Sequence, residues 1–219
     1  MENVGGARNV TGLSRKFMLR VGSYVWHHTR TNPVEITSLF RDCDVILLQR
    51  FPERYKSYFG HCHFFENWQQ HGMLVKGGNN IDCYTLQNNP ATHSISQGRV
   101  IPTLRLPNLN IISCLTSYDI PNQNNQLHQV MELFDSQDKP SVIVGDMHWE
   151  DQYINNLYEK YQLINHIKEP TFTGRRGEKL SLDKILTAQD VVISDIRIHS
   201  ELASNNIEHY PLEFTIDVK

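Results

Sequence analysis

The sequence predicts an α+β fold in which two mixed β-sheets pack face to face and helices cover their outer faces. Strand-like runs recur from residue 17 to residue 218, only two or three helical segments interrupt them, and strict strand–helix alternation is absent. A single domain over 17–219 accommodates all of these runs. Residues 1–16 contain Gly, Asn and Arg without periodicity, and we expect them to form a loose leader.

The expected strands are apolar or β-branched runs bounded by Gly, Asn and Pro. DVILLQ and PSVIVGD are continuous apolar runs, which is typical of strands buried on both faces, so their central residues should be nearly fully buried. The runs 99–106 and 109–117 should form a hairpin through Pro107 and Asn108. In chain order, the expected strands are 17–26, 44–49, 61–66, 72–76, 81–86, 99–106, 109–117, 140–146, 180–187, 190–200 and 211–218.

Three helices are expected between these strands. Asn32, Pro33 and Glu35 provide an N-cap, a proline at the first helical position and a capping-box acid for a helix that continues to about residue 41. In the segment 126–134, apolar residues recur on one helical face. A polar, aromatic segment over 150–160 predicts the third helix.

Composition excludes several classes of protein. With 39% hydrophobic and 21% charged residues, the chain can bury a core, which excludes a disordered or fibrous protein. Its 21 basic and 24 acidic residues give a net charge of −3, so a protein that coats DNA is not expected, although a local cationic groove is compatible with this charge. The oligomeric state is left open.

Cysteine spacing and apolar run lengths bear on the compartment. The four cysteines form no CxxC pair, and the N-terminus has no apolar signal core, so we expect reduced thiols and a cytoplasmic protein; export without an N-terminal signal is left open. No segment approaches the roughly 20 apolar residues of a membrane span.

Acidic and imidazole side chains follow or begin several expected strands. These residues are Asp146, His148, Asp183, Glu208 and His209. Carboxylates can hold a divalent cation and orient water, and an imidazole titrates near neutrality, which together suit phosphoester hydrolysis. Each residue also has a plainer interpretation: a helix N-cap for Asp146, an edge charge for Asp183, and a solvated loop for the Glu-His pair.

Five motifs in this order resemble the endonuclease/exonuclease/phosphatase superfamily, which includes deoxyribonuclease-like enzymes. DVILLQR resembles the family's "DVI-L-QE", SVIVGDMHW its "GDFN" turn, SLDKIL its "IDHI" strand and NNIEHYPL its "SDHxP". RVIPTLRL and LNIISCLTS resemble its paired middle strands. The resemblance covers about residues 17–218 and implies a four-layer αββα sandwich, which agrees with the strand pattern.

The resemblance also implies roles for individual residues. Asp146 matches the Asp that orients or deprotonates the attacking water, and Asp183 the Asp that supports the imidazole or the metal. Glu208 stands where the family has Asp, and His209 where it has the histidine that contacts the phosphate. Asp146, Asp183 and Glu208 would bind Mg²⁺ or Mn²⁺, weakly in this chain.

The chain departs from the family pattern at four positions. A metal-binding Glu is replaced by Arg50, an Asn by His148, an Asn of the first strand by Tyr24 or Val25, and a His by Leu115 or Thr116. Arg50 exchanges a negative charge for a positive one beside the expected cation, and its guanidinium could instead bind a phosphate directly.

Two functions are therefore considered. The first is a metal-dependent phosphodiester or phosphate hydrolase of nuclease-like type with weak activity, and the alternative is a degenerate member that binds phosphate, nucleic acid or protein. The loop Thr171–Lys179 carries Arg175 and Arg176, which suit contacts to phosphate groups, so nucleic acid is slightly favoured over other phosphoesters. A solvated hairpin is the plainer interpretation of this loop.

Overall fold

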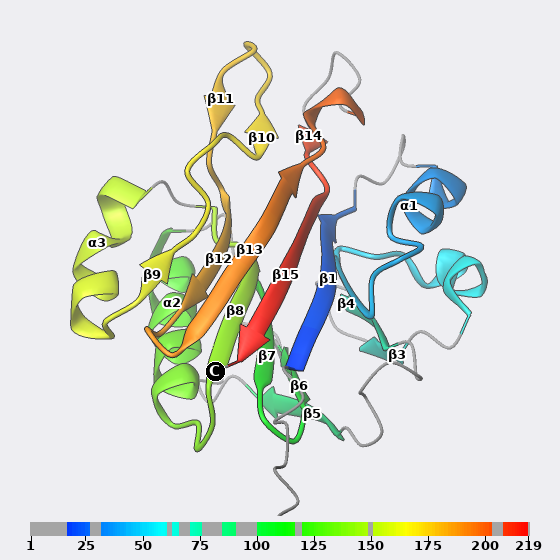
Figure 1. Cartoon of the computed structure of the whole chain (residues 1–219). Helices are drawn as coiled ribbons and strands as arrows, with labels where there is room; N and C mark the ends of the chain where they lie inside the picture. Colours follow the sequence, from blue (N-terminus) through cyan, green and yellow to red (C-terminus); the bar gives the residue numbers. More distant parts are fainter. Residues whose placement is uncertain are drawn as a thin grey trace, which may run out of the picture.

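The structure is a computed structural model of the chain, and it describes residues 17–26, 32–60, 63–65, 71–75, 85–90, 100–116, 120–148, 151–202 and 208–218. Two six-stranded mixed sheets dominate it (Figure 1). The first sheet has the order β13 (Val191–Ile198), β15 (Leu212–Val218), β1 (Phe17–Val25), β2 (Val45–Gln49), β4 (His71–Val75) and β3 (His63–Phe65). The second sheet has the order β5 (Thr85–Pro90), β6 (Val100–Arg105), β7 (Asn110–Leu115), β8 (Ser141–Asp146), β12 (Asp183–Thr187) and β9 (Ile164–Asn165).

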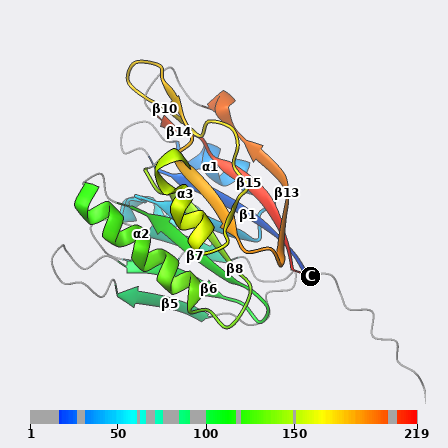
Figure 2. The ribbon, with the colours of Figure 1, turned by 90° about the vertical axis from the view of Figure 1, so that its left-hand side faces the viewer.

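The helices lie on the outer faces of the two sheets. Helix α1 (Pro33–Leu39) and the 3₁₀ helix η1 (Glu53–Phe59) pack on the first sheet through Ile36, Phe40 and Phe59. Helices α2 (Ile120–Asp135) and α3 (Asp151–Lys160) pack on the second (Figure 2). The predicted four-layer αββα sandwich is therefore confirmed.

The core between the sheets explains why the apolar runs are strands. Side chains alternate along a strand, so Val45 and Leu47 of β2 face the second sheet while Ile46 faces α1. Strand β8 behaves in the same way, because Val142 and Val144 lie in the central core and Ile143 lies under the helices. All six residues predicted to be buried in these strands have exposed fractions of 0–1%.

The predicted start of the first helix is also correct. Asn32 Oδ1 accepts a hydrogen bond from the Val34 amide at 3.0 Å, and Pro33 is the first helical residue. The Glu35 carboxylate accepts from the Asn32 side-chain amide. The helix ends at Leu39, two residues earlier than expected, and Phe40 then packs against Gly22, where a Cβ would lie 2.5 Å from the Phe40 ring.

Two expected strands have clearly different bounds in the structure. The run 180–187 is two strands, because β11 (Lys179–Leu180) pairs with β10 (Phe172–Thr173) whereas β12 pairs with β8. The strand expected over 81–86 is found at 85–90, where pairing with β6 overrides the low strand propensity of its Asn residues; 81–84 lie outside the described residues. Of the strand expected over 61–66, residues His63–Phe65 form β3, and the other positions lie outside the described residues.

A small third sheet was not predicted. It has the order β11, β10 and β14 (Glu208–His209), and in Figure 1 it extends above one end of the two large sheets. Two-residue strands carry no periodicity, so sequence patterns do not reveal them. The remaining short element is the 3₁₀ helix η2 (Ser200–Leu202).

None of the helices in the described part of the chain is both long and apolar enough to cross a membrane.

Candidate functional site

Polar residues replace the apolar core at the end of the sandwich where β2 and β8 finish. The side chain of Gln49, the last residue of β2, is fully buried and follows Val45 and Leu47 on the same face of the strand. Its Nε2 donates to Ser113 Oγ at 3.2 Å on the opposite sheet and lies 3.4 Å from Ser23 Oγ. Gln49 therefore forms a polar floor between the two sheets, and its buried Oε1 has no hydrogen-bond partner among the residues that the structure describes.

Asp146 lies at the end of β8, beside this floor, and is fully buried. The preceding Gly145 has φ +136°, and a Cβ there would lie 2.0 Å from the Cys114 carbonyl oxygen, so the Gly-Asp pair requires its glycine. Asp146 Oδ1 accepts from the His148 amide at 2.8 Å, closing an Asx turn. This turn places His148 Nε2 3.0 Å from Asp146 Oδ2.

Asp183 and His209 form a buried pair next to Asp146. Asp183 lies at the start of β12, and its Oδ2 is 2.8 Å from His209 Nδ1. If Nδ1 carries the proton it donates to Asp183, and Nε2 is left facing Asp146 Oδ2 at 3.5 Å. The ring of Phe172 lies against the His209 ring at a centroid distance of 4.7 Å and limits its rotation.

Thr171 connects the strands that carry this pair. Its Oγ1 accepts from the backbone amides of Asp183 at 2.9 Å and Leu182 at 3.1 Å. Its carbonyl oxygen accepts from the Tyr210 amide at 2.7 Å, directly after His209. One fully buried residue therefore positions both members of the Asp183–His209 pair.

Arg50 completes the cluster from the first sheet. Its Nη2 lies 3.0 Å from His148 Nε2, and Thr116 Oγ1 lies 3.3 Å from the other ring nitrogen of His148. Both Arg50 (φ 53°) and His148 (φ 55°) have left-handed backbones, which cost roughly 1–2 kcal/mol each for residues with a Cβ. The surrounding structure holds both residues in these uncommon conformations.

The charges in this cluster shift the pKa values of two groups. Burial raises the pKa of Asp146, but attraction to His209, His148 and Arg50 outweighs this and lowers it from 3.8 to about 2. Burial lowers the pKa of His209, but the carboxylates of Asp183 and Asp146 outweigh it and raise the pKa above its ordinary value, with Arg50 acting in the opposite direction. Asp146 is therefore anionic at neutral pH, and His209 holds its proton more tightly than a free imidazole.

The structure thus brings together five of the predicted site residues: Arg50, Asp146, His148, Asp183 and His209. The backbone of Glu208 pairs with Thr173 in the small sheet, and the Glu208 side chain lies outside the described part. Arg175 and Arg176 are exposed in the turn between β10 and β11, where the Arg176 amide donates to Glu178 Oε2. The catalytic, phosphate-binding and metal-binding roles of all these residues remain predictions.

The sequence indicated no role for Gln49 and Thr171, and Thr116 was expected only as one of two residues that could replace a histidine of the family. A polar residue at the end of the apolar run DVILLQ was a usable signal for Gln49, since burial of an amide needs partners. Thr116 and Thr171 carry no such signal, because their contacts come from strands distant in sequence.

A divalent cation is the cofactor that the resemblance implies, and the described side chains do not fit one. Asp146 Oδ2 is buried, and a carboxylate oxygen is a ligand that divalent cations prefer. However, the imidazoles of His148 and His209 approach this oxygen, and the Arg50 guanidinium contacts His148. Within the described ranges, no three His, Cys, Asp or Glu side chains gather in an arrangement that could hold a metal ion.

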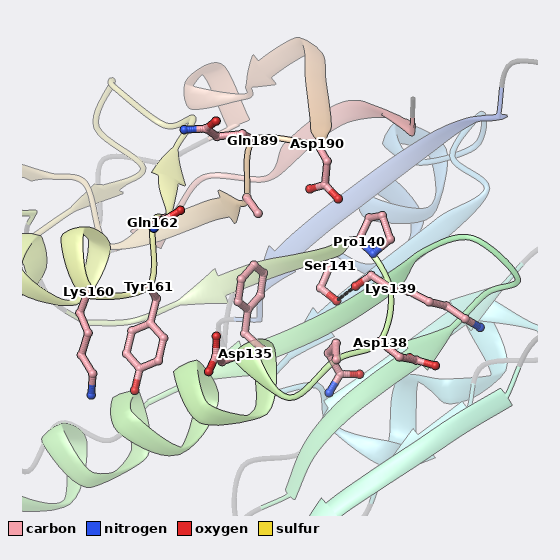
Figure 3. Close-up of a pocket in the computed structure, with 13 residues that line it drawn as sticks. Asp135, Asp138, Lys139, Pro140, Ser141, Lys160, Tyr161, Gln162, Gln189 and Asp190 are labelled. Atoms are coloured by element: carbon pink, nitrogen blue, oxygen red, sulfur yellow. Dashed lines mark hydrogen bonds between the residues drawn. The ribbon is translucent and has the colours of Figure 1, made fainter.

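A hollow of about 640 Å³ lies at the other end of β8 (Figure 3). It is formed by the C-terminal ends of α2 and α3, the start of β8 and residues 188–190. Ser141, the first residue of β8, lines this hollow, whereas Asp146 is the last residue of the strand. The hollow and the charged cluster are therefore about 17 Å apart along the strand.

Comparisons with known proteins identify the fold. No protein-family model and no curated protein sequence matches the chain. Among solved structures, the 3′ phosphatase NExo from Neisseria, bound to a product DNA hairpin, is 16% identical with a TM-score of 0.66, covering 92% of this chain and 99% of that one. TDP2 from D. rerio, complexed with a single-strand DNA product, is 13% identical with a TM-score of 0.66, covering 91% and 98%.

A third structure carries the name of the superfamily. This endonuclease/exonuclease/phosphatase family protein from Bacteroides thetaiotaomicron is 11% identical with a TM-score of 0.65, covering 94% of this chain and 96% of that one. The three structures match nearly the full length of the chain and share its architecture. The chain therefore has the fold of the endonuclease/exonuclease/phosphatase superfamily.

Proposed function

We propose that this protein is a nuclease-like hydrolase that cleaves a phosphoester slowly at the end of the sandwich where β8 and β14 meet. The observation that carries this proposal is the buried Asp183–His209 pair, whose Nε2 lies 3.5 Å from the Asp146 carboxylate. An acid and an imidazole held in this way can orient a water molecule and a phosphate oxygen in the same place.

Each group has a defined part in the proposed reaction. The Asp146 carboxylate accepts a hydrogen bond from the attacking water, and protonated His209 donates from Nε2 to a phosphate oxygen. The water oxygen bonds to phosphorus and gives up a proton to the Asp146 carboxylate, the bond from phosphorus to the leaving oxygen breaks, and that proton is passed on to the leaving alkoxide. Because the pKa of Asp146 is about 2, this carboxylate is a weak base, which agrees with slow turnover.

Nucleic acid is the proposed substrate class. Two proteins of the same fold were captured with DNA products, and the exposed Arg175 and Arg176 lie in the hairpin of the small sheet that contains His209. Guanidinium groups beside the site suit the phosphates of a nucleic-acid strand. The resemblance implies weak Mg²⁺ or Mn²⁺ binding at Asp146, Asp183 and Glu208, but the proposed reaction includes no metal ion, because the described side chains do not fit one.

The experiment is a cleavage assay on labelled single-stranded and duplex DNA and on a nitrophenyl phosphodiester, with and without Mg²⁺ or Mn²⁺. We expect slow cleavage by the natural protein, and none by His209→Ala. The matched control is His128→Ala, a histidine on α2 outside the cluster. Product formation that survives His209→Ala would contradict the proposal.

The second candidate function is phosphate or nucleic-acid binding without turnover, and Arg50 in the cluster favours it. This alternative would be supported if the protein binds a DNA strand, if Arg175→Glu weakens that binding, and if no cleavage occurs under any condition.

A further inference from the structure

Arg50 places a fixed positive charge inside the candidate site. Its guanidinium is 3.0 Å from His148 Nε2, which is itself 3.0 Å from Asp146 Oδ2. An arginine keeps its charge at any physiological pH. A divalent cation entering beside Asp146 would therefore meet a cation already in place, and like charges repel strongly where water is largely excluded.

The balance of charge supports the same conclusion. Among the described side chains of the cluster, the guanidinium of Arg50 offsets one of the two carboxylate charges of Asp146 and Asp183. A cluster with less negative charge attracts a divalent cation less strongly and repels a phosphate monoanion less.

The shape of the group is also suitable. A guanidinium presents several N–H donors in one plane, which matches two oxygens of a phosphate. Arg50 is partly exposed, whereas Asp146, Asp183 and His209 are buried. A ligand approaching from solvent can therefore reach Arg50 before it reaches the buried pair.

We propose that the Arg50 guanidinium, held against His148, takes the place of a divalent cation, so that the site binds the phosphate group of its ligand without a metal ion. This inference rests on the proposed function only in that the same site receives a phosphoester. It is a statement about binding, and it does not require turnover.

The test is calorimetric binding of dimethyl phosphate and of inorganic phosphate to the full chain in EDTA. We expect binding by the natural protein, and a loss of about ten- to a hundredfold in Arg50→Glu, as for a lost charge-assisted hydrogen bond. Arg50→Lys should lose part of the affinity, because it keeps the charge without the planar fork. The matched control is Arg54→Glu, an equal charge reversal at an exposed residue of η1, which should bind as the natural protein does.

A second titration measures Mg²⁺ and Mn²⁺ directly. Arg50→Glu should bind these ions more tightly than the natural protein, and Arg50→Gln, with a smaller change in charge, provides the same comparison if Arg50→Glu does not fold. Phosphate binding that requires Mg²⁺, no phosphate binding at all, or binding in EDTA that Arg50→Glu leaves unchanged would each overturn the inference. DNA cleavage is scored separately, so a protein that binds phosphate in EDTA without cleaving DNA contradicts only the proposed hydrolase.

Discussion

The two ends of strand β8 differ in the kind of site they offer. At the Asp146 end, ionisable side chains from both large sheets and the small sheet meet in a buried cluster. At the Ser141 end lies the hollow, and two of its lining residues donate hydrogen bonds to backbone carbonyls (Figure 3). Ser141 Oγ donates to the Lys139 carbonyl at 2.9 Å, and Lys139 Nζ donates to the Leu106 carbonyl at 3.3 Å.

This difference shows that a hollow and a cluster of buried ionisable side chains can lie in different parts of one molecule. A large hollow is the usual first choice for a ligand site. Here the acidic side chains that line the hollow are exposed, whereas Asp146 is buried and is attracted by His209, His148 and Arg50. Perturbed and buried ionisable groups are the stronger indication of function.

The largest expected contrast is between Asp146→Asn and Asp138→Asn. Each change removes one carboxylate charge at nearly constant size, one from the cluster and one from the hollow. Cleavage of the nitrophenyl phosphodiester should fall about 10²–10⁴-fold in Asp146→Asn, as is typical of a lost acid–base or positioning group, and remain unchanged in Asp138→Asn. Equal activity of the two variants would contradict the placement of the reaction at the Asp146 end of β8.

The next contrast compares two buried hydroxyl groups. Thr171→Val leaves the amides of Leu182 and Asp183 without their acceptor and should lower the free energy of unfolding by about 1–3 kcal/mol. Ser141→Ala removes only a donor to the Lys139 carbonyl, so about 1 kcal/mol or less is expected. Urea unfolding measures both values, and a larger loss in Ser141→Ala would contradict the ordering.

The pH dependence of stability is the third contrast. In the folded protein the pKa of Asp146 is about 2, whereas its ordinary value is 3.8. The ionised carboxylate therefore adds about 2 kcal/mol to the free energy of unfolding above pH 4, and this contribution is lost as the pH falls toward 2. The pKa of His209 is raised, so its contribution is present below pH 6.5 and is lost as the pH rises through the folded value. Asp146→Asn should flatten the acidic limb and His209→Gln the alkaline limb, whereas Asp138→Asn should leave both limbs unchanged in urea unfolding.

The same two ends show how far sequence reasoning reaches. The end of β8 was predictable, because the apolar run SVIV determines a buried strand and the Gly-Asp pair ends it. The order of Asp146, Asp183 and His209 along the chain indicated a shared site. The contact of Arg50 with His148 was not predictable in detail, because it joins residues 98 positions apart and depends on two left-handed backbones.

Short and non-local pairings limited the prediction in the same way. Strands β10 and β14 pair only two residues each, yet they place Phe172 against His209. The division of 180–187 into β11 and β12 depends on which sheet each half joins, and not on the residues themselves. The positioning role of Thr171 follows from these pairings and is invisible in the local sequence.

The smallest expected effect compares two exposed cation–aromatic pairs, one beside each end of the sandwich. Arg54 lies 4.9 Å from the Tyr55 ring in η1, and Lys160 lies 4.8 Å from the Tyr161 ring at the hollow. Exposed pairs of this kind contribute about 0.5–1 kcal/mol, so Arg54→Ala and Lys160→Ala should each lower the free energy of unfolding by that amount or less. Neither variant should alter dimethyl phosphate binding in EDTA, because neither residue belongs to the buried cluster. Weaker phosphate binding in Lys160→Ala alone would place a ligand site in the hollow and would reverse the comparison between the two ends.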